Sequence, residues 1–377
     1  MLRTLMAAVL ISCSAATAGT ERNADGMPVI VEKMASKLDV PWSVAFLPGC
    51  EFLITQRGGE LLHFGSSGVR TEVGGVPKVR ADGQGGLLDV AATGNFEQSR
   101  EILLSYAKPQ GRRAGTALAI AALSPDSSQL INPTEIFEMA PGSSGGRHFG
   151  SRIAEAPDGT IFLTIGERGD RQSAQELSNH NGTIIRIKRD GSVPTDNPFV
   201  DQSDAQPEIW SYGHRNPQGA TFDAEGRLWI NEHGARGGDE INLARKGANH
   251  GWPVISYGVH YTGRKIGLGT EREGMEQPAF YWDPSIAPSG MAIYSGRLWP
   301  EWKGHFFIGS LKSDFISRVG PEGGFRELER IRFPETKRVR DVREAPDGTI
   351  WFLSEDRGAA YRISPTGFEP ECSPRSR

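Results

Sequence analysis

Several features that define other classes of protein are missing from this sequence. Beyond the first 18 residues, no segment approaches the roughly 20 continuous apolar residues that a membrane-spanning helix needs. The formal net charge is only −4, so neither nucleic acid nor an anionic membrane is expected as a partner. No long stretch keeps a 3.6-residue apolar period, which argues against a helical fold. We therefore expect a soluble protein with a mildly acidic surface and few helices.

Turn-forming residues are what the sequence has in excess. It contains 47 glycines and 24 prolines among 377 residues, a composition that favours an all-β fold. One pattern recurs: a turn such as Pro-Asp-Gly, then a short run of apolar or β-branched residues, then small or polar ones. Its six occurrences begin at Leu47, Phe96, Pro157, Ala224, Trp302 and Pro346.

This repeat predicts the architecture. Six irregular repeats spaced by about 60 residues suit blades of four antiparallel strands. We therefore predict a six-bladed β-propeller that spans residues 19–377 as one catalytic domain. A β-sandwich with repeated hairpins is the alternative that the pattern leaves open.

Residues 1–18 have the form of an export signal. Arg3 supplies a positive charge, residues 5–12 form a short apolar core, and Ala16-Thr17-Ala18 is a cleavage site. We expect a soluble protein exported to the periplasm. The segment 10–13 also resembles a bacterial lipobox, which would instead leave Cys13 lipid-anchored.

Removal of this signal leaves two cysteines, Cys50 and Cys372, in a compartment that permits disulfides. They lie near opposite ends of the chain, and a closed ring of blades brings those ends together. We therefore predict a disulfide between them, the alternative being two free thiols.

Two loops in the first half of the chain carry candidate functional side chains. Gln84 stands among glycines just before an apolar run, so its amide is expected at a loop tip, either as a ligand contact or simply as a turn residue. His148 is flanked by Arg147 and Arg152. An imidazole beside cations should stay neutral, the form that accepts a proton as a general base, although a lone histidine can also be structural.

The segment 208–253 combines a cationic turn with an acidic, glycine-rich loop. Arg215 presents a planar fork and Asn216 an amide on one turn, a pairing suited to carboxylate or quinone oxygens. Glu232, Asp239 and Glu240, with the carbonyls of residues 234–238, offer the oxygen ligands that calcium takes. The spacing is not that of an EF-hand loop, so a solvated acidic turn is equally compatible with these residues.

Three further cations lie near the C-terminus: Lys312, Arg338 and Arg340. Because alternate residues of a strand share a face, the two arginines should point the same way. Without a neighbouring carboxylate they would repel each other unless an anion lies between them; the alternative is two solvated arginines on an edge strand.

In a propeller these separate stretches converge on the central axis. The residues that can line one pocket there are Gln84, His148, Arg215, Asn216, Lys312, Arg338 and Arg340. Such a pocket would be strongly cationic, so it suits a multiply anionic ligand better than a neutral sugar alone.

The motifs, taken in order, resemble the glucose/sorbosone dehydrogenase family of six-bladed propellers that use pyrroloquinoline quinone (PQQ), and look most like its bacterial soluble aldose sugar dehydrogenases. The resemblance covers nearly the whole mature chain. Its carriers are Asp82-GQGGLLDV, His148-FGSR, Asn181-GTIIRIKRDGSVPTDNPF, Gly213-HRNPQG, Glu232-HGARGGDEINL, Gly247-ANHGWP, Pro284-SIAPSGMAIYSG, Gly309-SLK and Arg338-VRDV.

The resemblance implies roles for the candidate residues. His148 matches the catalytic base, and Arg215 lies beside the reacting centre. Cofactor-binding positions match Gln84, Arg215, Asn216, Lys312, Arg338 and Arg340, with Tyr261 as a further contact near the cofactor. The carbonyls of Gly234 and Ala235 match ligands of the calcium ion on the quinone. Glu240 matches a ligand of a second calcium, at which His250 stands where the family commonly carries tyrosine.

The implied activity is oxidation of an aldose at the anomeric carbon to a lactone, with hydride transfer to the quinone and calcium as second cofactor. A separate electron acceptor is needed because the sequence has no Cys-x-x-Cys-His motif for c-type haem. Two other functions stay open: a calcium-dependent propeller lactonase, which would not need the C-terminal cations, and a non-catalytic carbohydrate-binding propeller.

Overall fold

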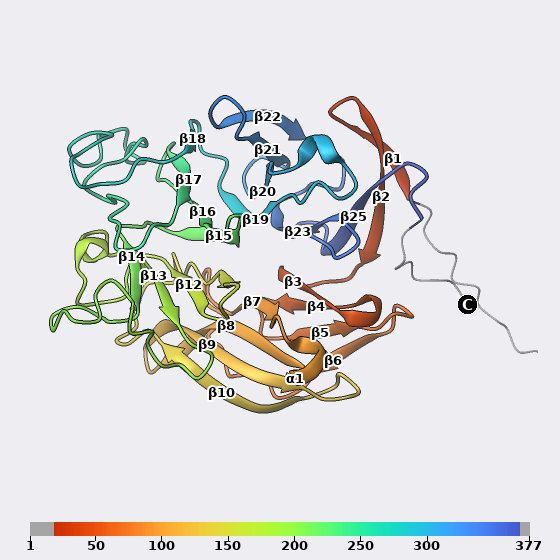
Figure 1. Cartoon of the computed structure of the whole chain (residues 1–377), viewed down its shortest axis with the longest axis horizontal. Coiled ribbons are helices and arrows are strands. Elements are labelled where there is room, and N and C mark those ends of the chain that lie inside the picture. The colour runs from red at the N-terminus through yellow and green to blue at the C-terminus, as the bar shows by residue number, and fades with distance from the viewer. Residues whose placement is uncertain (1–18, 370–377) are drawn as a thin grey trace, which may run out of the picture.

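Six antiparallel β-sheets surround one axis in this chain, which confirms the predicted all-β, six-bladed propeller (Figure 1). The computed structural model describes residues 19–369. Five of the sheets contain four strands that follow one another in sequence. The first is made of β3 (Pro41–Leu47), β4 (Glu51–Gln56), β5 (Leu61–Phe64) and β6 (Arg70–Val73). The second is made of β7 (Leu87–Ala92), β8 (Glu101–Gln110), β9 (Arg113–Leu123) and β10 (Leu130–Glu138).

The next three sheets repeat this plan. The third contains β11 (Ile153–Glu155), β12 (Ile161–Ile165), β13 (Thr183–Ile187) and β14 (Ile209–Tyr212). The fourth contains β15 (Pro217–Phe222), β16 (Leu228–Glu232), β17 (Asp239–Leu243) and β18 (Phe280–Trp282). The fifth contains β19 (Pro288–Ile293), β20 (Phe306–Ser310), β21 (Ile316–Gly320) and β22 (Arg326–Ile331). The first strand of each sheet lies innermost and contacts the first strands of both neighbouring sheets.

The sixth sheet closes the ring from both ends of the described chain. Its strands, in spatial order from the axis, are β23 (Val339–Glu344), β24 (Ile350–Ser354), β25 (Ala359–Pro365), β2 (Met27–Ala35) and β1 (Thr20–Ala24). β2 pairs antiparallel with β25, with Val31 opposite Ile363. This sheet has one strand more than the four predicted for each blade, because β1 pairs with the outer edge of β2.

Helices are short in residues 19–369. They are α1 (Phe96–Ser99) and the 3₁₀ turns η1 (Pro48–Cys50), η2 (Gln172–Gln175) and η3 (Pro300–Trp302). Within this part of the chain, no helix is long and apolar enough to cross a membrane.

The six sequence repeats fall on the second strand of each sheet, namely β4, β8, β12, β16, β20 and β24. Two of the turns that begin these repeats are closed by hydrogen bonds to an aspartate. Oδ1 of Asp158 accepts hydrogen bonds from the backbone N–H and the hydroxyl of Thr160, at 2.9 and 2.6 Å. Asp347 holds Thr349 in the same way, at 3.0 and 2.6 Å. The glycine between each pair has a positive φ, which explains why the Pro-Asp-Gly turn recurs.

The hydrophobic core consists of layers between neighbouring sheets. In one layer Leu103 and Leu118 of the second sheet pack against Ile161 and Ile185 of the third. Every residue of β12 is buried, because both faces of its sheet are covered. This is why the repeats read as continuous apolar runs and not as an apolar–polar alternation.

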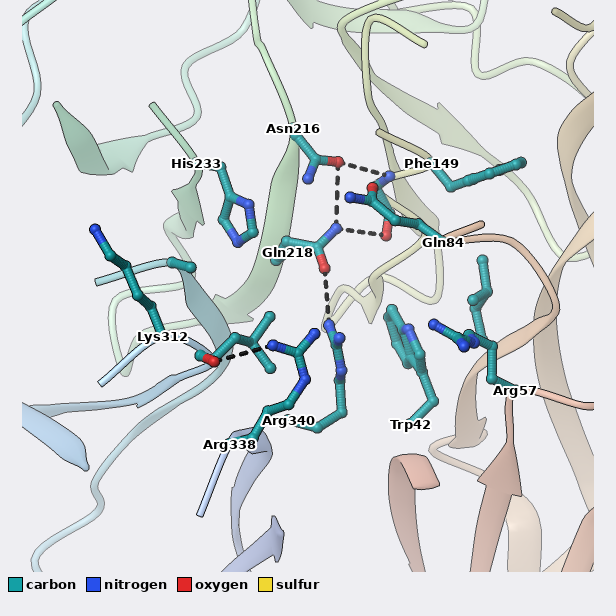
Figure 2. A pocket seen from close by; sticks show the side chains of 14 residues that line it. Trp42, Arg57, Gln84, Phe149, Asn216, Gln218, His233, Lys312, Arg338 and Arg340 are labelled. Atoms are coloured by element: carbon teal, nitrogen blue, oxygen red, sulfur yellow. Dashed lines mark hydrogen bonds between the residues drawn. The ribbon is translucent and has the colours of Figure 1, made fainter. Parts of the chain in front are cut away.

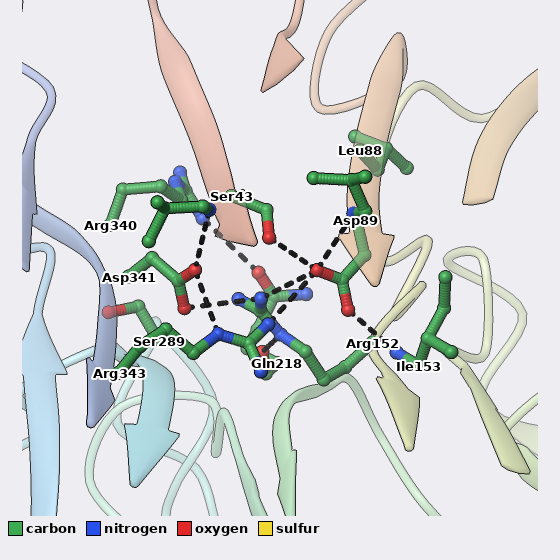
Figure 3. A network of polar contacts seen from close by, with 12 residues as sticks. Ser43, Leu88, Asp89, Arg152, Ile153, Gln218, Ser289, Arg340, Asp341 and Arg343 are labelled. Carbon is green, nitrogen blue, oxygen red and sulfur yellow. Dashed lines mark hydrogen bonds and ion pairs between the residues drawn. The ribbon is translucent and has the colours of Figure 1, made fainter. Parts of the chain in front are cut away.

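An ion-pair network occupies the axis among the inner strands (Figure 3). Nη1 of Arg152 lies 3.0 Å from Asp89 of β7 and 3.1 Å from Asp341 of β23. Arg343 joins the same two carboxylates, at 3.0 and 3.1 Å. Ser43 of β3 donates its hydroxyl to Asp89. Side chains from four sheets or the loops that enter them therefore tie the ring together at its centre.

The termini carry predictions that the structure tests only in part. Cys50 is disulfide-bonded, as predicted for this residue. Its predicted partner Cys372 lies outside the described residues, as do Cys13 and the signal segment 1–18, so these assignments stay predictions.

Candidate active site

A cavity of about 300 Å³ lies on the propeller axis (Figure 2). All six sheets contribute to its wall, through an inner strand or the loop that enters it. One residue from each of them is Trp42, Leu88, Gly150, Gln218, Ala287 and Arg340. This volume is at the lower end of the range of roughly 300–1,000 Å³ for small-molecule sites.

Five of the predicted site residues meet in this cavity: Gln84, Asn216, Lys312, Arg338 and Arg340. The first and last of them are more than 200 residues apart in the sequence. They lie just before or at the start of the inner strands β7, β15 and β23, and just after β20. The propeller therefore brings together five of the seven side chains that were expected at one pocket; His148 and Arg215 do not line this cavity.

The two C-terminal arginines are paired with a carboxylate that the sequence did not reveal. Glu355, in the turn between β24 and β25, lies 2.8 Å from Nε of Arg338 and 3.0 Å from Nη2 of Arg340. Burial raises the pKa of Glu355, but the charges of Arg340 and Arg338 outweigh it and hold the pKa below its ordinary value. A bound anion would be needed between these arginines only without a neighbouring carboxylate, and Glu355 supplies one.

Two other cations remain without a counter-charge. Within residues 19–369, no ion pair or hydrogen bond involves the side-chain nitrogens of Lys312 or Arg57 (Figure 2). Glu355 offsets only part of the positive charge around the cavity, because four cationic side chains line it. The cavity therefore keeps a net positive charge that suits an anionic ligand.

A chain of amides orients the polar wall (Figure 2). Oδ1 of Asn216 accepts hydrogen bonds from the backbone N–H of Gly150 at 3.2 Å and from Nε2 of Gln218 at 3.3 Å. Oε1 of Gln218 accepts in turn from Nη1 of Arg340 at 3.3 Å. Oε1 of Gln84 accepts from the backbone N–H of His148 at 2.7 Å. The amide oxygens are thus engaged, which leaves the NH₂ groups of Gln84 and Asn216 as donors for a ligand.

His148 stands beside this cavity, next to the lining residues Phe149 and Gly150. Its Nδ1 lies 2.9 Å from Oε1 of Glu167, off the line of the ring N–H. With Nδ1 on the carboxylate, Nε2 is the nitrogen left to accept a proton. The side chain is largely buried, so the pair is shielded from bulk water.

Burial lowers the pKa of His148, and the charges of Arg215 and Arg147 lower it further, whereas Glu167 acts in the opposite direction. The imidazole is therefore neutral at pH 7. The predicted cation Arg152 is not its neighbour but belongs to the axial network. The backbone turns sharply between His148 and Arg152, because His148, Gly150 and Ser151 all have positive φ. The side chains of His148 and Arg152 therefore point in different directions.

Arg215 lines the small cavity that Gly234 and Gly238 also line, and it does not line the axial cavity. Its backbone N–H donates to Glu232 at 2.7 Å, its Nη1 donates to the carbonyl of His233 at 3.2 Å, and its guanidinium lies over the ring of Trp252. Tyr261 is 70% exposed and lies close enough to raise the pKa of Arg215, which burial lowers. Tyr261 is therefore at the surface near Arg215 and not in the wall of the cavity.

Three of the four predicted metal ligands meet at a second, much smaller cavity of about 20 Å³: Gly234, Glu240 and His250. Ala235 follows Gly234 and is not part of its wall. Within residues 19–369, no three His, Cys, Asp or Glu side chains are arranged to hold one ion. A cation here would therefore depend on backbone carbonyls as well as side chains.

The other acidic residues of this region, Asp239 and Glu232, accept hydrogen bonds from backbone N–H groups. Asp239 accepts from the N–H groups of Gly234, Ile286 and Ala287, at 2.8, 2.7 and 2.8 Å. Glu232 accepts from Arg215 and is paired with His214 at 2.9 Å. Both are buried, so the alternative of a solvated acidic turn is wrong for them.

His250 differs from a typical structural histidine. Its ring stacks on His214 with centroids 4.3 Å apart, and neither ring nitrogen has a hydrogen-bond partner within residues 19–369. Burial lowers the pKa of His250 well below its ordinary value, and the charges of His214 and Arg245 act in the same direction. The ring is therefore neutral and offers an unused nitrogen lone pair.

Sequence reasoning missed several residues of the site. Gln218, the second residue of β15, could have been considered, because it lies two positions after Asn216, which directly precedes that strand. His233 also lines the cavity; Nε2 contacts the carbonyl of Pro288 at 2.8 Å, and burial with the charge of Arg215 lowers its pKa to about 3. Glu167 and Arg57 had no signal beyond their residue type.

Comparison with known proteins agrees with this geometry. The family model described as Glucose / Sorbosone dehydrogenase matches residues 38–362. The aldose sugar dehydrogenase YliI of Escherichia coli strain K12 is 44% identical over 345 residues, which cover 89% of this chain and 93% of that relative. The crystal structure of the soluble aldose sugar dehydrogenase of Escherichia coli in its apo form has a TM-score of 0.86 at 43% identity, covering 89% of this chain and 99% of that one.

A PQQ-bound aldose sugar dehydrogenase from Streptomyces coelicolor has a TM-score of 0.74 at 25% identity, covering 89% of this chain and 98% of that one. The family match spans most of the chain, and the resemblance found from the sequence motifs is confirmed. This chain belongs to the glucose/sorbosone dehydrogenase family.

Proposed function

We propose that this protein is a PQQ-dependent dehydrogenase that oxidises aldose sugars at the anomeric carbon to lactones. The observation that carries the proposal is the axial cavity with four cationic side chains and free amide donors, beside the His148–Glu167 pair. The PQQ-bound relative from Streptomyces coelicolor supports the same cofactor.

The residues of the axial cavity fit a quinone that carries three carboxylates. Lys312 and Arg57 have no ion-pair partner in the described part of the chain, and Arg338 and Arg340 are held in place by Glu355. Arginine forks and a lysine ammonium group are the usual partners of carboxylates. The NH₂ groups of Gln84 and Asn216 would donate to neutral oxygens of the same molecule.

The residues around the 234–238 loop fit calcium as a second cofactor. His233 lines the axial cavity, and the carbonyls of the next two residues, Gly234 and Ala235, would hold a calcium ion beside the quinone. The second calcium ion would be held by the carboxylate of Glu240 and by His250. Both residues line the cavity of about 20 Å³. Oxygen donors of this kind are those that calcium prefers.

The chemistry then follows from the positions of the side chains. The bound cofactor, with its calcium ion, would supply the acceptor for the hydride. His148 is the base: its neutral Nε2 takes the proton of the anomeric hydroxyl. Glu167 holds the other ring nitrogen and stabilises the imidazolium that forms. Arg215 places a buried positive charge near the same centre, which favours negative charge that develops on an oxygen.

We propose that the protein works in the periplasm, after removal of residues 1–18, and passes electrons to a separate acceptor. The aldose is its small-molecule substrate.

The test uses purified protein freed of metal and cofactor. Adding PQQ with calcium should produce aldose-dependent reduction of a redox dye, and mass spectrometry should identify the lactone or its hydrolysed acid. Hydrolysis of lactones without PQQ would identify a lactonase instead. Silence in both assays, with sugar binding retained, would leave a carbohydrate-binding propeller.

A further inference from the structure

Five cationic side chains lie together at the end of the propeller where the axial cavity opens. Gln84 and Lys312 line that cavity and are exposed, so the opening is at this end of the ring. The loops of the second and third sheets that meet here are residues 74–86, 111–112 and 139–152. Together with the first residue of β9 they carry what we call the basic patch: Lys78, Arg80, Arg112, Arg113 and Arg147.

Hydrogen bonds hold the loops of the basic patch against one another. Ala114, which follows Arg113, donates its backbone N–H to the carbonyl of Ser143 and accepts a hydrogen bond in return, both at 3.0 Å. Nη1 of Arg80 donates to the carbonyl of Gly111 at 3.3 Å. The turn between β8 and β9 is therefore bound to the loop on either side of it, and the patch is one continuous surface.

The basic patch borders the candidate active site. The carbonyl of Gly146 accepts a hydrogen bond of 2.7 Å from the backbone N–H of Gln84, which lines the axial cavity. Arg147 follows Gly146 and directly precedes His148. A protein that covers the patch would therefore also lie beside the opening of the axial cavity.

Most of the charge of the patch has no counter-charge. Asp82 is the one acidic residue of the three loops, and its carboxylate lies 3.7 Å from Nη2 of Arg80. The other four cations are exposed, and their side chains have no ion-pair or hydrogen-bond partner within residues 19–369: Lys78, Arg112, Arg113 and Arg147. The next loop, residues 166–182, carries the exposed acids Asp170 and Glu176, so the patch ends there.

The opposite end of the same two sheets has the opposite charge. It is formed by the connections that follow the first and third strands of each sheet. Arg100, Lys188 and Arg189 are the basic residues of these connections. They are outnumbered by acidic residues, namely Glu97, Asp126, Asp158, Asp190, Asp196, Asp201, Asp204 and Glu208. These sheets are therefore cationic where the axial cavity opens and anionic at the other end, in a chain whose net charge is −4.

We infer that the basic patch is the docking surface for an acidic one-electron carrier protein that accepts the electrons taken from the sugar. Such a charge distribution attracts an acidic partner to the cavity end and repels it from the opposite end. A small oxidant that enters the cavity itself would have no use for the patch. This inference rests on the proposed function and specifies the electron acceptor.

The electrons and protons of the reaction balance with such a partner. Oxidation of one aldose to a lactone releases two electrons and two protons. Two carrier molecules dock in turn and are each reduced by one electron, and the two protons pass to water. Each carrier must leave before the next one docks, which a patch of exposed side chains permits because exposed ion pairs are weak.

Two soluble one-electron carriers of opposite surface charge test the inference: plastocyanin, which is acidic, and cytochrome c, which is basic. With an aldose present, the PQQ-loaded protein should reduce plastocyanin at least about 10-fold faster than cytochrome c at low ionic strength, because electrostatic attraction raises association rates by roughly 10- to 1,000-fold. The difference should shrink as salt is added, since salt screens the attraction.

Charge reversal on the patch is the decisive change. Arg112→Glu combined with Arg113→Glu alters two exposed side chains, so the variant should fold. It should lower the second-order rate constant for plastocyanin at least about 10-fold and leave reduction of an uncharged redox dye unchanged. The matched control, Lys188→Glu with Lys246→Glu, makes the same change in net charge at the opposite end, where both lysines are exposed. It should not slow the reduction of plastocyanin.

A binding measurement separates this inference from the proposed function, because it needs no cofactor. Immobilised plastocyanin should capture the cofactor-free protein at low salt in biolayer interferometry, and the double Arg112→Glu, Arg113→Glu variant should not be captured. No dye reduction with any aldose, with this patch-dependent capture retained, would overturn the proposed function and leave the docking surface standing.

Three other results would overturn the docking surface itself. One is reduction of plastocyanin at the wild-type rate by the double Arg112→Glu, Arg113→Glu variant. The second is equal rates for plastocyanin and cytochrome c with the wild-type protein. The third is binding to vesicles of anionic phospholipid that is tighter than binding to plastocyanin and is lost in the same variant, which would assign the patch to a membrane surface.

Discussion

Oε1 of Glu167 lies 2.9 Å from Nδ1 of His148, and both groups are buried beside the axial cavity. The contact sets which ring nitrogen remains free and places a negative charge where an imidazolium would form. It also links β12, which ends just before Glu167, to the loop that enters β11.

Replacement of His148 should remove the base but not the cofactor site. We expect His148→Gln to lower kcat by about 10²–10⁴-fold, because a positioned general base is worth this much. PQQ affinity, measured by absorbance titration, should stay within a few fold of wild type. Glu167→Gln should lower kcat less, since the imidazole itself remains. Wild-type turnover in His148→Gln would remove this residue from the proposed role.

The activity should persist below the ordinary pKa of histidine. The pKa of His148 is lowered, chiefly by burial and then by Arg215 and Arg147. The base works when neutral, so kcat/KM should fall only as the pH drops through this depressed pKa, below 6.5. Arg147→Gln removes a nearby cation and should move this acid limb to higher pH. Arg112→Gln, which replaces an exposed arginine in the turn between β8 and β9, is the control; an equal shift in both variants would contradict a local effect of Arg147.

Loss of an unpaired cation from the axial cavity should weaken cofactor binding. Hydrogen bonds to charged groups contribute about 1.5–3 kcal/mol, so Lys312→Ala should raise the Kd for PQQ by roughly 10- to 150-fold. The control Lys33→Ala removes an exposed lysine from β2 and should have no effect. Fluorescence titration gives both constants. Equal affinities in the two variants would contradict an anion-binding cavity.

The axial network should matter for stability. Arg152→Met leaves Asp89 and Asp341 as buried carboxylates with one arginine between them, and breaking a buried pair in this way costs about 3–5 kcal/mol. Arg227→Met breaks an exposed pair with Asp223 and should cost at most about 1 kcal/mol. Urea unfolding of the two variants measures the difference. Similar midpoints would mean that the network adds nothing to the stability of the ring.

The sequence predicted the blades correctly because their pattern repeats. It did not predict side-chain contacts between residues on different strands and turns. The repeated turns, two of them Pro-Asp-Gly, revealed six blades because each repeat supplies the second strand of its sheet. Gln84, Asn216 and Lys312 could be placed in one pocket because propeller loops converge on the axis. The sequence could not show that Glu355 pairs with Arg338 and Arg340, because a turn and the strand β24 separate Glu355 from them along the chain. Arg152 was assigned to His148 from adjacency alone, and the positive φ angles between them reversed that expectation.

The pairing of β2 with β25 has a consequence for synthesis. The sixth sheet cannot close until residues 359–365 have been synthesised, because no earlier strand occupies that position in this sheet. Until then β2 has an open edge, and the inner strands at the seam lack one neighbour. A ribosome that stalls late in the chain would therefore leave five blades beside an unfinished sixth, whose open edge proteases and chaperones could recognise.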